Sequence, residues 1–270
     1  VLIVSLAEQT NEDTMMNDVK NFINGEYRAS SAGKSFDNIN PCTGELNGSV
    51  QEATREDVDA AVQAAREALA GPWSTMTDDE RGAILLKVAD GIDRRFDEFL
   101  AAECADTGKP YNIASHIDIP RGAANFRVFA DAVKNFSTEA FQMATPDGNG
   151  AFNVAVRKPK GVIAVISPWN LPLLLMTWKV GPALACGNTV VVKPSEETPT
   201  TTSLLGEVMN EAGVPPGVFN VVNGFGPDSA GAFLTEHSGI DAITFKTIKC
   251  FNRCQSHFPP GGLYRAGVSK

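Results

Sequence analysis

The sequence predicts an α/β fold built on a doubly wound parallel sheet. Short apolar runs typical of strands buried on both faces alternate with stretches compatible with helices. The strands are expected at 161–167, 188–194, 218–222 and 241–245, and the helices between them at 171–186, 200–212 and 228–236. This alternation indicates βαβ units with right-handed crossovers. A sheet of this kind binds ligands at the carboxyl ends of its strands.

Composition narrows the class of protein. The 270 residues are 43% hydrophobic and 20% charged, which is enough apolar material for a substantial core. The formal net charge of −9 makes a nucleic-acid backbone an unfavourable partner. Five cysteines, an odd and sparse set, argue against a secreted disulfide framework. The first residues fit neither a signal peptide nor a membrane span, so we expect a cytoplasmic protein.

The N-terminal half, 21–136, is predicted to add strands and helices to the cofactor domain, after an extension over 1–20 expected to be disordered. Asn24-Gly25 favours a type I′ turn in a hairpin. Thr54 is predicted to cap one helix, and a longer helix is expected from Thr77, with an apolar stripe as far as Phe96. A further helix is expected over 120–136, and arm-like strands over 137–160.

The C-terminal tail, 246–270, differs in composition from the rest. It holds five basic residues and no acidic one, and it shows no strand or helix period. We interpret it as foreign to the fold, as a frameshift, a splice variant or a damaged reading frame would produce. Cys250, Cys254 and His257 have a spacing that invites a zinc site, but a fourth ligand is not obvious. Accidental spacing is the better explanation, and we expect no metal.

Polar groups follow three successive strands of the predicted sheet. Lys193 is a cation suited to ribose hydroxyls or phosphate, and Glu196 is an acceptor for a ribose diol that would repel a 2′-phosphate. Gly226 allows a backbone to approach phosphate ahead of a helix N-terminus. Each group alone is explained by a turn that ends a strand. Their joint occurrence, together with Ser167-Pro168-Trp169-Asn170, predicts a dinucleotide site.

The residues at these strand ends form motifs that resemble those of a known enzyme superfamily. Ser167–Pro199 and Gly224–Gly231 resemble the aldehyde dehydrogenase superfamily, and the likeness runs from about residue 22 to 245. Asp106–Pro110 and Ala114–Asp131 resemble the subgroup of 2-hydroxymuconic semialdehyde dehydrogenases. The resemblance implies a Rossmann-like NAD-binding domain and NAD-dependent oxidation of a ring-cleavage semialdehyde to a dicarboxylate. A 2-aminomuconic semialdehyde is the alternative substrate.

The resemblance also implies roles for individual residues. Asn170 would belong to the oxyanion hole, which typically contributes about 3–4 kcal/mol to transition-state stabilisation. The other implied ligands are the nicotinamide-side residues Ile166, Ser167 and Trp169, the adenosine-ribose ligands Lys193 and Glu196, the adenine-side Gly226, and Leu175 and Trp178 in the substrate tunnel.

Arg121 is a candidate anchor for the substrate carboxylate. It lies in the Asp118-Ile119-Pro120-Arg121 motif typical of the subgroup. A remote carboxylate calls for a fork-shaped cation, which arginine supplies. The alternative is a surface arginine that caps a helix or pairs with Asp118.

The resemblance further implies what this chain lacks. In the family, the nucleophilic cysteine and the glutamate base lie downstream of the fourth strand, and no cysteine here matches the nucleophile. Cys186 is expected to be an inert core thiol. We therefore expect the chain to be inactive alone, or to be a non-catalytic NAD-binding fragment. Homo-oligomers are expected for the full-length family but are left open for this chain.

Overall fold

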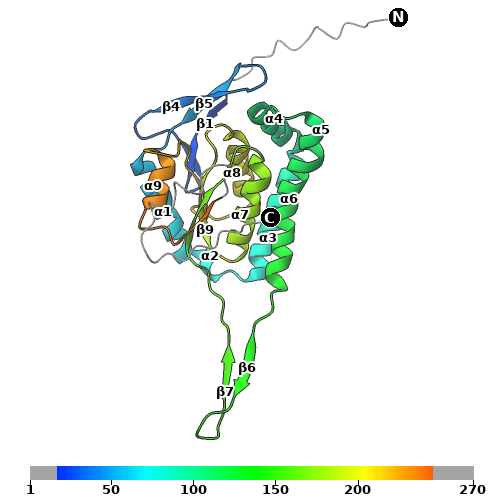
Figure 1. Cartoon of the computed structure of the whole chain (residues 1–270), viewed down its shortest axis with the longest axis vertical. Coiled ribbons are helices and arrows are strands. Elements are labelled where there is room, and N and C mark those ends of the chain that lie inside the picture. Colours follow the sequence, from blue (N-terminus) through cyan, green and yellow to red (C-terminus); the bar gives the residue numbers. More distant parts are fainter. Residues whose placement is uncertain (1–16, 246–270) are drawn as a thin grey trace, which may run out of the picture.

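A six-stranded sheet forms the centre of the protein, whose computed structural model describes residues 17–245 (Figure 1). Its strand order is β11-β8-β9-β10-β2-β3. The first four strands are parallel, and β2 pairs antiparallel with β10. The strands are β2 (Asn21–Ile23), β3 (Glu26–Arg28), β8 (Val162–Ile166), β9 (Thr189–Lys193), β10 (Phe219–Val221) and β11 (Ala242–Phe245).

Helices cover both faces of this sheet, which confirms the doubly wound arrangement. Val162 and Ala164 of β8 pack into one apolar core, whereas Ile163 and Val165 pack into the other. This alternation follows from the two-residue period of a strand. One face carries α3 (Asp78–Arg94), α4 (Phe96–Thr107), α6 (Ile119–Lys134), α7 (Pro172–Ala185) and α8 (Thr200–Ala212), and the other carries α1 (Arg55–Ala70) and α9 (Ala230–Glu236).

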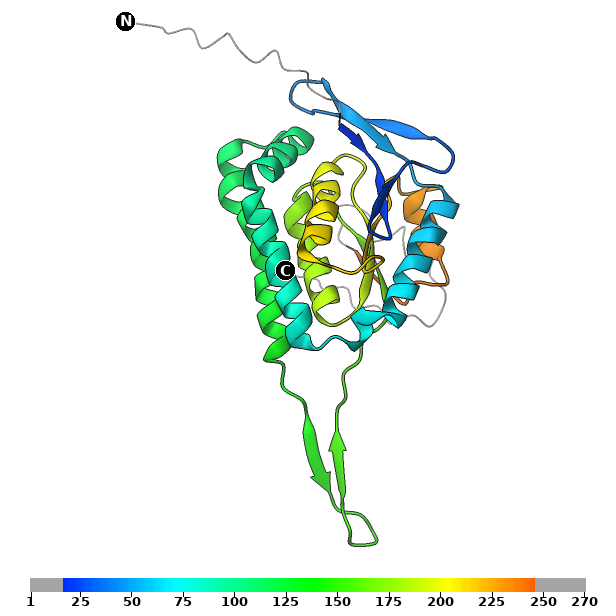
Figure 2. The same ribbon diagram turned by 180° about the vertical axis from the view of Figure 1, so that it is seen from behind.

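A second, three-stranded sheet lies beside the central one (Figures 1 and 2). It has the order β1-β5-β4, formed by Asn17–Val19, Leu46–Gln51 and Ser35–Ile39. The expected disordered extension over 1–20 is therefore wrong at its end, because residues 17–19 make a parallel ladder with β5. The Asn24-Gly25 hairpin is confirmed, with φ of 56° and 81° at its two central residues.

The two helix starts are confirmed, but one helix end is not. Thr54 caps α1 and Thr77 caps α3, each in a reciprocal capping box. Phe96 does not belong to α3, because Arg95 leaves the helical region at φ −102° and ψ 27° and Phe96 opens α4. Three short elements connect the helices: α2 (Pro72–Thr75), α5 (Tyr111–Ile113) and the π-helical turn η1 (Ala114–Asp118).

A two-stranded arm stands out from the body (Figures 1 and 2). It consists of β6 (Ala140–Met143) and β7 (Ala151–Val154), paired antiparallel. Phe141 and Phe152 on it are 61% and 68% exposed. The arm therefore presents apolar side chains to its surroundings.

The tail 246–270, with Cys250, Cys254 and His257, lies outside the described residues. Within 17–245, no cluster of three or more His, Cys, Asp or Glu side chains has an arrangement that could hold a metal ion. No helix in that same range combines the length and the apolar character needed to cross a membrane.

We expect Gly217→Ala to destabilise the fold more than Gly213→Ala. Both glycines have positive φ, at 81° and 83°, so each substitution carries a conformational cost of about 1 kcal/mol. A Cβ at Gly217 would lie 2.4 Å from the carbonyl oxygen of Ala64 in α1, whereas nothing lies within 4 Å at Gly213. The forced shift of α1 should add roughly 2 kcal/mol. Urea unfolding measures both variants, and equal losses would contradict the packing argument.

Candidate functional site

The loops that carry the predicted site residues leave the same edge of the central sheet. In the parallel register Ile166 lies opposite Lys193, and Val192 lies opposite Val221. The Ser167 amide donates to the Lys193 carbonyl at 3.2 Å, and the Val222 amide donates to the Val192 carbonyl at 2.9 Å. The loops 167–171, 194–199 and 223–229 therefore start side by side. This is the edge where an open α/β sheet binds its ligands.

A buried ion pair follows β9. Lys193 is only 4% exposed, and its Nζ lies 2.8 Å from Glu196 Oε2. Burial lowers the Lys193 pKa, although the Glu196 carboxylate opposes this effect. Partial burial alone would raise the Glu196 pKa, but the Lys193 cation outweighs it and the pKa is lowered. Since Glu196 is the single partner of the ammonium among the described residues, two of its donors are available to a ligand.

The loop after β10 is shaped by glycines. Gly224 has φ of 146°, and a Cβ there would lie 2.8 Å from Ser229 Oγ. A Cβ on Gly226 would enter open space, with nothing within 4 Å. The backbone at Gly226 is therefore unobstructed on that side, which fits the close approach of a phosphate. Sequence reasoning gave Gly224 no role of its own, and it missed Glu52, whose Oε1 accepts from Ser229 Oγ at 2.7 Å.

The loop after β8 holds an unsatisfied amide. Ser167 is buried and Ile166 half-buried, whereas Trp169 is 54% exposed. The Asn170 Oδ1 is buried without a hydrogen-bond partner, and its Nδ2 has none among the described residues. The Nδ2 group is the donor of this side chain, so it is the atom that could donate to a substrate oxygen.

The substrate candidates lie on two parallel helices whose starts are in contact. A Cβ at Gly122 in α6 would be 2.8 Å from Leu173 in α7, so the helices approach closely there. Arg121 is exposed in the first turn of α6, at the same end as the Asn170 loop. Further along α7, Leu175 is buried, whereas Trp178 is 51% exposed and packs edge-on against Phe129. The structure thus brings these residues to neighbouring helices.

The alternative pairing of Arg121 with Asp118 is wrong. Asp118 is fully buried and forms its ion pair with Lys109. Arg121 has no ion-pair or hydrogen-bond partner in the part of the chain that the structure describes, so its guanidinium is available to an anion.

Two buried carboxylates on α4 were missed by sequence reasoning. Glu103 is fully buried, and burial raises its pKa to about 7 even though Lys109 opposes the shift. Asp106 is 4% exposed, and burial raises its pKa to about 6 against hydrogen bonds from Asn38 and Thr200. Their spacing of three residues places both on one face of the helix, but no local pattern distinguishes them from acids on an exposed face.

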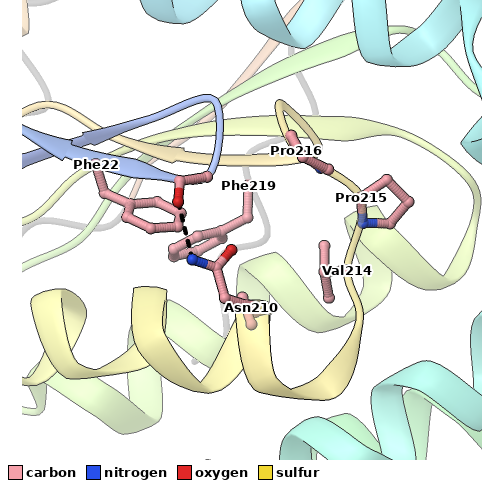
Figure 3. Close-up of a pocket in the computed structure, with 8 residues that line it drawn as sticks. Phe22, Asn210, Val214, Pro215, Pro216 and Phe219 are labelled. Atoms are coloured by element: carbon pink, nitrogen blue, oxygen red, sulfur yellow. Dashed lines mark hydrogen bonds between the residues drawn. The ribbon is translucent and has the colours of Figure 1, made fainter.

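Two other features lie away from the strand ends. The hollow in Figure 3 is lined by residues that include Phe22, Asn210, Pro216 and Phe219, at the amino end of β10. The Asn210 side chain donates there to the Gly25 carbonyl at 2.9 Å. Cys186 is exposed at the far end of α7, so the expected core thiol is wrong. Neither feature belongs to the candidate site.

Comparison with known proteins identifies the family. Residues 27–247 match the model described as the aldehyde dehydrogenase family. The chain belongs to the aldehyde dehydrogenase family. This confirms the resemblance seen in the motifs, and with it an oxidoreductase family that acts on aldehydes.

Named relatives agree with this assignment. The chain is 71% identical over 230 residues to a 2-hydroxymuconic semialdehyde dehydrogenase of Pseudomonas sp. (strain CF600), covering 85% of this chain and 47% of that relative. It is 54% identical to a 2-aminomuconic 6-semialdehyde dehydrogenase of Pseudomonas sp., covering 85% and 46%. An NAD⁺ complex of a Bacillus cereus aldehyde dehydrogenase superposes with a TM-score of 0.80 at 40% identity, covering 84% and 45%. The chain spans about half the length of these aldehyde dehydrogenases.

We expect Glu196→Gln to lower the free energy of unfolding by about 1–2 kcal/mol at pH 7, because it leaves the buried Lys193 ammonium unpaired. This loss is smaller than that expected when one partner of a fully buried ion pair is removed, since Glu196 is partly exposed. The Glu196 pKa lies below its ordinary 4.5 in the folded state, so the carboxylate stabilises the fold above that pH. The difference between the two proteins should shrink as the pH falls below 4.5.

Urea unfolding at several pH values measures this difference. Glu197→Gln is the matched control, because Glu197 is exposed and its carboxylate has no partner among the described residues. An equal loss in both variants, or a difference that is independent of pH, would contradict the account.

Proposed function

We propose that the protein to which this chain belongs oxidises a semialdehyde with a remote carboxylate to the dicarboxylate, using NAD⁺. The main support is that the loops after β8 and β9, which hold Asn170 and the Lys193–Glu196 pair, leave the same edge of the sheet. The identity of 71% to a 2-hydroxymuconic semialdehyde dehydrogenase makes that compound the first substrate candidate. The 54% identity to a 2-aminomuconic 6-semialdehyde dehydrogenase supports the amino analogue as the second.

Several described residues support dinucleotide binding. The Lys193–Glu196 pair would bind the adenosine ribose, and the Glu196 carboxylate would repel a 2′-phosphate, which favours NAD over NADP. The open space at Gly226 suits the adenine side, and Ile166, Ser167 and Trp169 would lie beside the nicotinamide riboside. NAD⁺ supplies the hydride acceptor of the reaction.

The chain also supplies groups for the aldehyde. The Asn170 amide would donate to the carbonyl oxygen as negative charge develops on it. Leu175 and Trp178 would line the path of the apolar part of the substrate, and Arg121 would bind the remote carboxylate with its fork of donors.

We assign the nucleophile and the base to the part of the relatives that this chain does not span. The three described cysteines lie away from the strand ends: Cys104 is buried in α4, Cys42 lies in the turn after β4, and Cys186 follows α7. The chain alone should therefore bind NAD⁺ without turning over an aldehyde.

The proposal extends to the oligomeric state and the cellular compartment of the protein. The exposed apolar side chains of the β6–β7 arm support a homo-oligomer of the longer protein, since an unpaired strand edge favours association. The sparse cysteines support a cytoplasmic setting.

Isothermal titration of this chain with NAD⁺ and NADP⁺ tests the dinucleotide assignment. We expect NAD⁺ to bind more tightly, and Glu196→Gln to reduce the preference about tenfold, because the repulsion of the 2′-phosphate is removed. Glu197→Gln should keep the original preference. Binding of neither dinucleotide, or an unchanged preference in Glu196→Gln, would contradict the assignment.

Steady-state kinetics of the longer protein test the substrate. We expect Arg121→Ala to raise KM for the carboxylated semialdehyde roughly 10–100-fold and to leave a simple aldehyde nearly unaffected, since a charged hydrogen bond is lost. Arg127→Ala is the matched control on α6, because Arg127 pairs with Asp90 and Asp93. Equal effects on both aldehydes would contradict the role of Arg121. Turnover of an aldehyde by the present chain alone would contradict the proposal that the nucleophile lies outside it.

A further inference from the structure

Helix α4 contacts the beginnings of two other helices through its buried acids. Glu103 and Asp106 lie one turn apart and point into the protein, at 0% and 4% exposure. Burying a carboxylate is costly unless hydrogen bonds offset its desolvation. The identity of the donors therefore indicates what each carboxylate does.

Glu103 accepts from the start of α7. Its Oε2 receives the Leu173 amide at 3.3 Å, and its Oε1 lies 3.4 Å from Lys109 Nζ, which also pairs with Asp118. The first amides of a helix have no acceptor within the helix. Leu171, at the N-cap of α7, makes no side-chain cap. Glu103 therefore supplies from α4 the acceptor that the local sequence does not provide.

Asp106 accepts in the same way from the start of α8. Its Oδ2 receives the Thr200 amide at 2.9 Å, and its Oδ1 receives the Thr200 hydroxyl at 2.9 Å and the Asn38 side chain at 2.8 Å. The N-cap of α8 is Pro199, which offers no side-chain acceptor. No charged side chain forms a hydrogen bond or ion pair with Asp106 in the described part of the chain, so its hydrogen bonds alone offset its burial.

The two capped helices follow two of the three loops of the candidate site, 167–171 and 194–199. Leu173 comes three residues after Asn170, and Thr200 comes four residues after Glu196. We propose that Glu103 and Asp106 are positioning residues that fix, from one rigid helix, where both loops re-enter the fold. Their effect on ligand binding rests on the proposed function, whereas their effect on the loops does not.

Hydrogen exchange of the full chain at residue resolution tests this proposal. Glu103→Met removes the acceptor while keeping the length of the side chain, and it should speed exchange of the Leu173 amide about tenfold or more without changing Thr200. Asp106→Leu should do the reverse. Glu103→Gln keeps an acceptor oxygen and should restore slow exchange at Leu173. Asp97→Asn, at an exposed position of α4, is the control and should change neither amide.

The same experiment can overturn the proposal. Equal acceleration of both amides in each variant would show general loosening, and no acceleration in either would show that the carboxylates do not hold the helix starts. If Glu103→Met or Asp106→Leu fails to fold, hydrogen exchange of the wild-type chain tests the proposal instead. Its Leu173 and Thr200 amides should exchange as slowly as those in the interior of α7 and α8, and exchange within about tenfold of an unfolded chain would overturn the proposal.

Titration with NAD⁺ separates this proposal from the proposed function. Asp106→Leu should weaken NAD⁺ binding about tenfold through the 194–199 loop, with Asp97→Asn unchanged. Failure of the wild-type chain to bind NAD⁺ would contradict the proposed function only, because the exchange pattern judges the positioning residues independently. Unchanged NAD⁺ affinity in Asp106→Leu despite faster exchange at Thr200 would overturn the link between loop position and binding.

Discussion

The parallel pairing of β8, β9 and β10 is the constraint on which the rest of the protein depends. Parallel strands end at a common edge, so every loop that leaves them begins within hydrogen-bond distance of its neighbour's strand. Burial on both faces holds the strands in place up to this edge, because Ala164 and Val165 near the end of β8 pack into opposite cores. The buried strands stabilise the fold, and the loops that follow them hold the side chains of the candidate site.

Charge is distributed unevenly between the loops and their support. Lys193 and Glu196 form a pair at the carboxyl edge of the sheet, with the ammonium buried and the carboxylate partly exposed. On α4, Glu103 pairs with Lys109, which also pairs with Asp118. Burial raises the pKa of Glu103 to about 7. The pair at the edge belongs to the loop after β9, whereas the acids of α4 accept from the first amides of α7 and α8.

The sequence allowed most of the central sheet to be predicted, because buried parallel strands leave unbroken apolar runs such as Val162–Ile166 and glycines mark their ends. It did not reveal α4, where Glu103 and Asp106 occupy buried positions that the apolar pattern reserves for hydrophobic residues. Their donors are the main-chain amides of Leu173 and Thr200, 70 and 94 residues away. Side-chain contacts at such separation leave no local periodicity, so only the folded chain shows them.

The π-helical turn Ala114–Asp118 sets how the segment before it is oriented relative to α6. The amide of Ile119 bonds back five residues to Ala114, which places one extra residue between α5 and α6. One residue corresponds to about 100° of helical rotation. Because α6 is held by α3 and α7, removing the extra residue would rotate α5, and Lys109 before it, by about this angle relative to α6. A single-codon deletion in this turn would thus separate Lys109 from Asp118, with no change to the sheet beneath.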